Sequence, residues 1–144
     1  QIQNWIARPV RYKREGWSHK SFFSKFMIHT GVIIAIFLTI HLMNFYLVKA
    51  GITSAPQGPA RIADDHDFYG MAVNLFSNNT YSILYIILII LLGFHLNHAF
   101  QSAFQSLGLD HTKYTPFIKA VGDFYSIVVP LGFCMIPLYF LIYY

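Results

Sequence analysis

The fold is decided by residues 26–48, FMIHTGVIIAIFLTIHLMNFYLV, an apolar stretch of about 23 residues without Asp, Glu, Lys or Arg. At a rise of about 1.5 Å per residue, a helix of this length crosses the ~30 Å hydrocarbon layer of a bilayer. Lys25 and Lys49 lie just outside the stretch. The stretch therefore predicts a transmembrane helix.

Two further apolar runs, about 81–104 and 118–144, follow it. The second run becomes semi-polar toward its end and stops before Gly108, a residue suited to end a helix. The third contains Pro130 and Pro137, which membrane helices tolerate where neighbouring groups satisfy the freed carbonyls. The sequence predicts an all-α transmembrane bundle of three spans, forming a single domain over residues 1–144.

The segment 49–80 between the first two spans is predicted to be an external loop. Its proline and glycine residues break a helix and its aspartates mark contact with solvent. These residues are Pro56, Gly58, Pro59, Asp64, Asp65 and Asp67. A short interfacial helix is expected at about 68–76.

Composition agrees with a membrane protein. The chain is 56% apolar and 11% charged, against roughly 25% charged residues in a soluble domain. Its net charge of +4 comes from basic residues that lie beside apolar segments, without the interleaved aromatics of an RNA-binding motif. We therefore expect no nucleic-acid partner. The lone Cys134 cannot form an intrachain disulfide.

The distribution of basic residues predicts the orientation, because they concentrate on the cytoplasmic side of membrane proteins. Only Lys49 and Arg61 flank the 49–80 loop. The other eight lie before the first span or near the second connection: Arg8, Arg11, Lys13, Arg14, Lys20, Lys25, Lys113 and Lys119. The N-terminus is predicted inside and the C-terminus outside. Because the chain begins without Met or a signal peptide, we expect a piece of a longer protein.

The ionisable residues within the spans are interpreted as histidines only: His29 and His41 on the first, His95 and His98 on the second. One such histidine is ordinarily a hydrogen-bonded core residue, but intramembrane ionisable groups are costly and often functional. Four histidines without a carboxylate or Lys to form a relay favour metal ligation. Neutral imidazole binds haem iron, whereas zinc or copper would need ligands grouped more tightly.

The predicted depths of His41 and His95 separate them. His41 lies about 6 Å outward of the midpoint of its span and His95 about 5 Å inward, so they are roughly 11 Å apart along the membrane normal. They cannot share one iron. If both are ligands, there are two haems, and each takes its second axial ligand from outside this chain.

A different pairing is also possible. His29 and His98 lie at similar depths, about 12 Å and 10 Å inside the midpoint, and could clamp one haem. His98 lies near the face of His95, which favours a supporting or propionate-binding role. His29 is close to the basic end of its helix, where an exposed or propionate-facing role is equally ordinary. A polar stripe on the second span could face propionates or a partner helix: Asn97, Gln101, Ser102 and Gln105.

Several segments resemble a known family. They are Thr30-Gly31 followed by His41-Leu42, the run 93–108 (GFHLNHAFQSAFQSLG), and 7–12 (ARPVRY). Together they resemble the cytochrome b subunit of succinate dehydrogenase and quinol:fumarate reductase, in its single-subunit, two-haem form with five membrane helices from menaquinone-using bacteria. The chain corresponds to the last three of those helices.

The resemblance implies that His41 and His95 are axial ligands of two b-type haems. The partner histidines would come from the missing N-terminal helices or a companion chain. The haem of His95 would lie nearer a cytoplasmic iron-sulphur subunit, which receives electrons from a flavoprotein subunit, and menaquinone would be bound nearby. This chain would be a non-catalytic electron-transfer subunit in a bacterial cytoplasmic membrane, surrounded by lipid. No quinone ligand is implied for it.

Two alternatives stay open. The chain could be the two-haem anchor of another respiratory enzyme, such as a hydrogenase or formate dehydrogenase. It could instead be a haem-free structural membrane subunit whose histidines only form hydrogen bonds.

Overall fold

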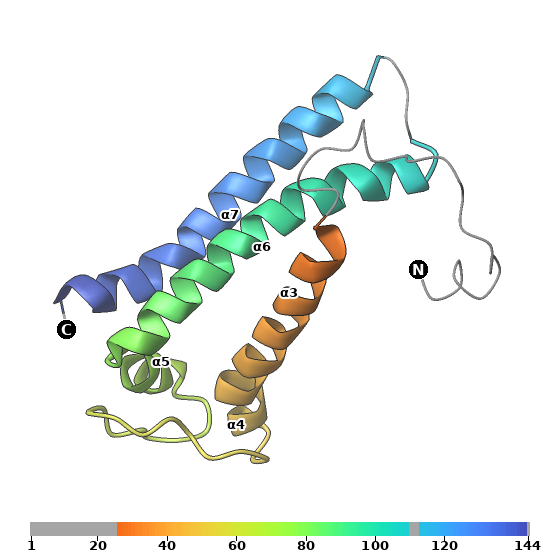
Figure 1. Cartoon of the computed structure of the whole chain (residues 1–144). Coiled ribbons are helices and arrows are strands. Elements are labelled where there is room, and N and C mark those ends of the chain that lie inside the picture. Colours follow the sequence, from red (N-terminus) through yellow and green to blue (C-terminus); the bar gives the residue numbers. More distant parts are fainter. Residues whose placement is uncertain (1–25, 110–112, 144) are drawn as a thin grey trace.

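The computed structural model describes residues 26–109 and 113–143, and these residues form helices joined by loops, with no strand among them. Three helical segments are long and apolar enough to cross a membrane: Met27–Lys49, α6 (Asn79–Ser106) and α7 (Thr115–Tyr143) (Figure 1). The predicted all-α, three-span fold is therefore confirmed. The 7–12 segment and the basic residues before the first span lie outside the described residues.

The first span consists of α3 (Met27–His41), the π-helical turn η1 (Leu42–Tyr46) and α4 (Leu47–Lys49). It ends at Gly51, whose φ of 69° lies in the left-handed region that glycine adopts without strain. Directly beyond this glycine, the backbone N–H of residue 52 donates to the carbonyl of residue 47 over 2.8 Å. This pattern of a left-handed glycine and a returning hydrogen bond is a Schellman cap.

Gly108 ends α6 in the same way, as the sequence predicted. Its φ is 72°. The backbone N–H of Leu109 donates to the carbonyl of Phe104 over 3.0 Å, and that of Gly108 donates to the carbonyl of Gln105 over 3.1 Å. These two bonds satisfy carbonyls that the helix leaves without partners.

The loop after α4 contains the expected short helix, α5 (Phe68–Phe76), which Asp67 caps through a side-chain oxygen. Asn74 on α5 is buried and holds the preceding loop against the helix. Its Oδ1 accepts from the backbone N–H of Ala60 over 2.7 Å, and its Nδ2 donates to the carbonyls of Pro56 and Ala60 over 3.0 Å each. The loop is therefore fixed to α5 by one side chain.

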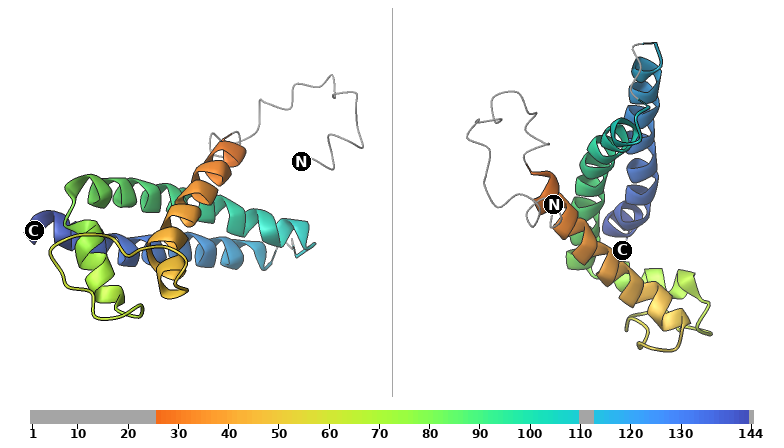
Figure 2. Two further views of the ribbon diagram at one scale, coloured as in Figure 1. Left: turned by 90° about the horizontal axis from the view of Figure 1, so that it is seen from below. Right: turned by 90° about the vertical axis from the view of Figure 1, so that its right-hand side faces the viewer.

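Helices α6 and α7 lie side by side in every view (Figure 2). Two glycines allow this approach. A Cβ atom on Gly122 would lie 2.6 Å from a ring carbon of Phe100, and one on Gly93 would lie 3.1 Å from the carbonyl oxygen of Ser126. That carbonyl has no helical N–H four residues later, because Pro130 occupies the position. Small residues permit the same close backbone packing in other membrane helices.

The buried core lies at the end of the bundle where α5 packs against the three long helices. Its residues are Phe37, Val73, Leu75, Phe76, Tyr85, Ile89 and Phe140. Elsewhere the long helices are largely uncovered, since only 11%, 22% and 22% of their most apolar segments are buried. These surfaces are suited to lipid or to further membrane-embedded protein.

Candidate functional site

The interface between α3 and α6 holds both of the histidines predicted to be metal ligands. The first helix meets α6 at two levels. Near its beginning, Thr30 contacts His95. Near its end, the ring of His41 lies 6.3 Å from the ring of Tyr85, measured between centroids. The His95 imidazole therefore contacts α3, and the exposed His41 imidazole lies beside α6.

The His95 imidazole is held by a hydroxyl group whose only hydrogen is already used. Thr30 Oγ1 donates to the carbonyl of Met27 over 2.9 Å and lies 3.1 Å from Nδ1 of His95. Since a hydroxyl carries one hydrogen, its oxygen must accept from Nδ1 of the imidazole. This arrangement puts a proton on Nδ1, so that in a neutral imidazole Nε2 is the nitrogen that carries the lone pair a metal would use.

His41 has a different environment, made of aromatic rings. Its ring centroid lies 5.1 Å from that of Phe45 and 6.1 Å from that of Phe37. The imidazole itself is exposed in this chain, although its neighbour Phe37 is buried. Aromatic rings therefore lie against one side of the His41 imidazole, and its other side is exposed.

The π-helical turn begins directly after His41 and changes the register of the helix. Asn44 in this turn donates from Nδ2 to the hydroxyl oxygen of Tyr85 over 3.0 Å. The Tyr85 side chain is only 2% exposed, and its ring packs edge-on against Phe37 and Phe76 at 5.3 Å and 5.1 Å. A hydrogen-bonded and closely packed group of Asn44, Tyr85 and Phe37 therefore lies beside His41. No pattern in the sequence predicted the π-helical turn.

The two imidazoles lie at different levels of the bundle. His95 and Tyr85, the residues that mark the two levels on α6, are ten positions apart, which corresponds to about 15 Å along the helix. A single iron cannot bridge that span. The geometry is compatible with two sites and not with one shared by His41 and His95.

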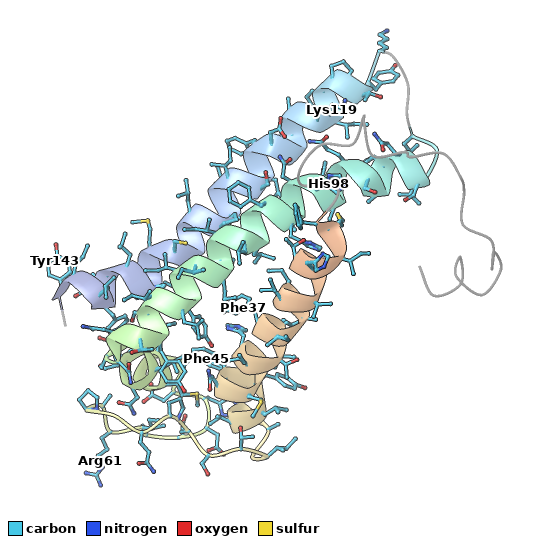
Figure 3. The ribbon with its side chains drawn as sticks, viewed as in Figure 1. Phe37, Phe45, Arg61, His98, Lys119 and Tyr143 are labelled. Carbon is cyan, nitrogen blue, oxygen red and sulfur yellow. The ribbon has the colours of Figure 1, made fainter. Side chains whose placement is uncertain are left out.

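The alternative pair, His29 and His98, is not joined by any contact among the described residues. His29 is exposed, and its ring centroid lies 6.0 Å from that of Phe26. His98 is half-buried on α6 (Figure 3). Within the same part of the chain, no three His, Cys, Asp or Glu side chains group as a metal site would require.

The interpretation that histidines are the only ionisable residues within the spans is wrong. Asp123 lies inside α7, and its Oδ1 accepts from Asn97 Nδ2 over 2.6 Å and from Gln101 Nε2 over 3.2 Å. Asn97 Nδ2 also lies 3.1 Å from Ser126 Oγ, as a donor. An intramembrane carboxylate is costly, and these amide donors offset part of that cost. Asp123 could have been found from the sequence, because it lies within the predicted 118–144 span.

The same contacts show which neighbour two of the four polar-stripe residues on α6 face. Asn97 and Gln101 face α7 through Asp123, so for these two the partner-helix interpretation holds. Ser102 and Gln105 are exposed and form no part of the cluster.

Comparison with protein-family models, curated proteins and solved structures found no match to this chain. The resemblance to succinate dehydrogenase anchors therefore rests on the sequence segments around His41 and His95. The three-helix fold and the geometry of the α3/α6 interface are independent of it.

Proposed function

We propose that this chain is the haem-binding part of a membrane anchor of the succinate:quinone oxidoreductase type. In this role it carries electrons between an iron-sulphur subunit and membrane quinone. His95 and His41 would each bind one b-type haem. The contact between Thr30 and His95 carries the proposal, because it occupies Nδ1 and leaves Nε2 as the ring nitrogen that could bind iron.

In this proposal the protein orients the two histidine rings and shields one side of His41 from water. Thr30 would orient the His95 ring through the contact at Nδ1. Tyr85 and Phe37 pack around one side of His41 and keep water from that side. A bound haem supplies reversible one-electron transfer, and the apolar helices supply low-dielectric surroundings that help set its potential.

A second axial histidine for each haem would come from further helices of the same protein or from a companion chain. The large uncovered apolar surface of the three spans supports such neighbours. His98 and His29 lie on the half of the bundle that holds His95, where haem propionates could accept hydrogen bonds from them.

The same proposal includes location and partners. The chain would lie in the cytoplasmic membrane of a bacterium with the 49–80 loop outside. Its inner side would contact the iron-sulphur subunit, with the flavoprotein beyond it and menaquinone in the bilayer. The eight-to-two distribution of basic residues supports this orientation.

The test is a reduced-minus-oxidised spectrum and redox titration of the purified complex, with variants His95→Ala and His41→Ala. We expect each variant to lose a different one of two b-type signals. His66→Ala is the matched control, since His66 lies exposed in the external loop, and it should keep both.

Other outcomes would contradict the proposal. Loss of both signals in one assembled single variant would exclude the division into two haems. Nickel or molybdenum in the complex, in place of flavin and fumarate reduction, would indicate a hydrogenase or formate dehydrogenase anchor. A spectrum without b-type bands would indicate the haem-free structural subunit.

A further inference from the structure

The π-helical turn after His41 redirects one backbone hydrogen bond of the first span. The backbone N–H of Leu47 donates to the carbonyl of Leu42, five residues back. In a continuous α-helix the same N–H would donate to the carbonyl of Met43. The Met43 carbonyl is therefore left without the donor that an α-helix would give it.

Thr53, in the loop after α4, donates to that carbonyl. Its Oγ1 lies 2.9 Å from the carbonyl oxygen of Met43, ten positions earlier in the chain. A backbone carbonyl without a donor is costly within a membrane span. The hydroxyl group thus stabilises the π-helical turn relative to a continuous α-helix.

Gly51 brings Thr53 back to the turn. Its φ of 69° reverses the chain at the end of α4, and the backbone N–H groups of residues 52 and 53 both donate to the carbonyl of Leu47, over 2.8 Å and 3.2 Å. Residues other than glycine adopt such a φ only with strain. The contact of Thr53 with Met43 therefore depends on this glycine.

Asn44 joins the same turn to α6. Its Nδ2 lies 3.0 Å from the hydroxyl oxygen of Tyr85, whose side chain is almost wholly buried. One hydrogen bond connects the two groups in either orientation of the amide. The turn is thus bonded both to the 49–80 loop and to a neighbouring span.

These bonds matter for His41 because part of its surroundings belongs to the turn. The ring of Phe45, a residue of the turn, lies 5.1 Å from the imidazole between centroids, closer than the 6.1 Å of Phe37. A return to α-helical geometry would change the register by one residue, about 100° around the helix axis. Phe45 and Asn44 would then be displaced relative to His41.

We propose that Thr53 and Asn44 are positioning residues for His41, which act by stabilising the π-helical turn. The inference deepens the proposed function and rests on it where the haem of His41 is concerned. A ligand that is oriented in advance loses less freedom when it binds. The 49–80 loop thereby affects the site at His41, while His95, oriented by Thr30, is independent of it.

The test uses two matched pairs of variants. Thr53→Val removes the hydroxyl donor, and its control is Thr39→Val, since Thr39 donates to the carbonyl of Ala35 over 2.9 Å. Gly51→Ala strains the reversal that places Thr53. Its control is Gly108→Ala, which introduces the same strain at the end of α6, and an added Cβ atom meets nothing within 4 Å at either glycine.

Two readouts separate this inference from the proposed function. The first is the NMR signals of the histidine ring nitrogens in the full chain, purified in detergent without haem. We expect the first variant of each pair to move the His41 signals alone, and its control to move neither those of His41 nor those of His95. The second is haem content and redox titration of the purified complex, where Thr53→Val should weaken haem binding at His41 about tenfold, the lower end of the range for supporting groups.

A double-mutant cycle tests the bond to α6. Asn44→Leu and Tyr85→Phe each remove one partner of the same hydrogen bond. Their effects on the His41 signals should therefore be non-additive, and the double variant should change about as much as either single variant.

Other results would overturn the inference. Unchanged His41 signals in folded Thr53→Val and Gly51→Ala would exclude a role for the turn. Equal changes at His41 and His95 would indicate general loosening of the bundle and refute a specific role. A complex without b-type signals would contradict the proposed function, and the NMR signals alone would then decide whether the turn positions His41.

Discussion

Individual residues hold the two candidate ligands by different physical means. His95 is oriented by the contact of its Nδ1 with the Thr30 hydroxyl group. His41 has aromatic neighbours, and a π-helical turn begins at the next residue of its helix. A hydrogen bond to one ring nitrogen strengthens the opposite nitrogen as a ligand, whereas ring packing restricts orientation only. The two imidazoles should therefore respond differently to substitution of their neighbours.

Thr30→Val tests this difference, because valine keeps the shape of threonine and removes the hydroxyl. The Nδ1–H of His95 then loses its acceptor in low-dielectric surroundings. We expect the haem assigned to His95 to bind about 10–100-fold more weakly, as found for lost supporting hydrogen bonds at metal sites. Haem content and a redox titration of the purified complex measure this.

Thr39→Val is the matched control on the same helix. Thr39 donates only to the carbonyl of Ala35, over 2.9 Å, and is exposed. This variant should retain both signals. If Thr30→Val also retained both with unchanged potentials, Thr30 would have no part in presenting His95.

At the scale of helices, the sequence predicted the structural features that depend on one segment alone. The spans, the 68–76 helix and the glycine that ends α6 follow from local hydropathy, helix breakers and capping. The contacts of Thr30 with His95, and of Asp123 with Asn97, depend on how two helices are rotated against each other. Long helices that are apolar all round carry little information about that rotation, since lipid and protein interiors are similarly apolar. That His41 and His95 lie at different levels of the bundle could be predicted from the sequence, and their neighbours could not.

Gly93 tests the packing of α6 on α7. Added atoms at this position would meet the Ser126 carbonyl at 3.1 Å and the Pro130 ring at 3.2 Å, and neither group is the movable end of a flexible side chain. Gly93→Leu should therefore separate the helices and destabilise the fold by about 1–3 kcal/mol, the usual range for overpacking. Thermal unfolding of the protein in detergent, followed by circular dichroism, measures the loss.

Gly132→Leu makes the same change on α7 where a Cβ atom would meet nothing within 4 Å. It should leave the unfolding temperature unchanged or raise it, because leucine favours a helix more than glycine does. Similar losses in both variants would show that the close contact at Gly93 does not hold the two helices together.

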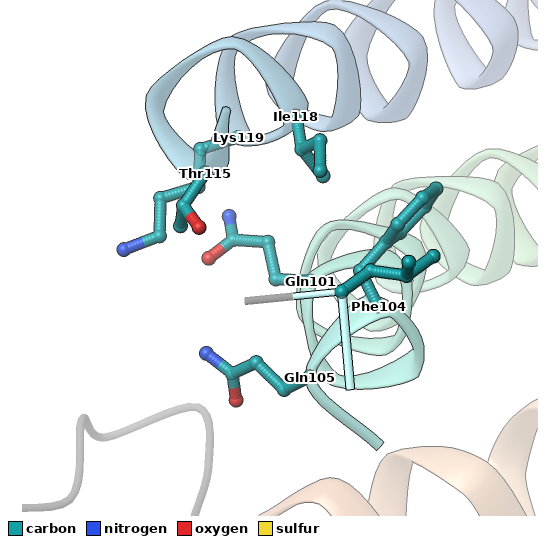
Figure 4. Close-up of a pocket in the computed structure, with 7 residues that line it drawn as sticks. Gln101, Phe104, Gln105, Thr115, Ile118 and Lys119 are labelled. Carbon is teal, nitrogen blue, oxygen red and sulfur yellow. The ribbon is translucent and has the colours of Figure 1, made fainter. Parts of the chain in front are cut away.

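The whole molecule is asymmetric along the direction of its spans. One end carries the buried aromatic core, α5 and the loop that Asn74 holds. The opposite end carries the Asp123 cluster and a shallow pocket whose lining includes Gln101, Gln105 and Lys119 (Figure 4). The end built from α5 is a closed cap, while the other presents polar groups suited to a headgroup layer and a soluble partner. The proposed orientation puts the cap outside and the polar end inside.

Single introduced cysteines test that orientation. Ser54 lies exposed in the 49–80 loop, and Lys113 lies exposed before α7. In a Cys134→Ser background, which removes the native thiol, Ser54→Cys should react with a membrane-impermeant maleimide in intact cells. Lys113→Cys should react only after the membrane is made permeable, because basic residues next to spans stay on the cytoplasmic side. The reverse labelling pattern would invert the topology, and an iron-sulphur partner would then have to dock against the α5 cap, which carries few basic residues to meet it.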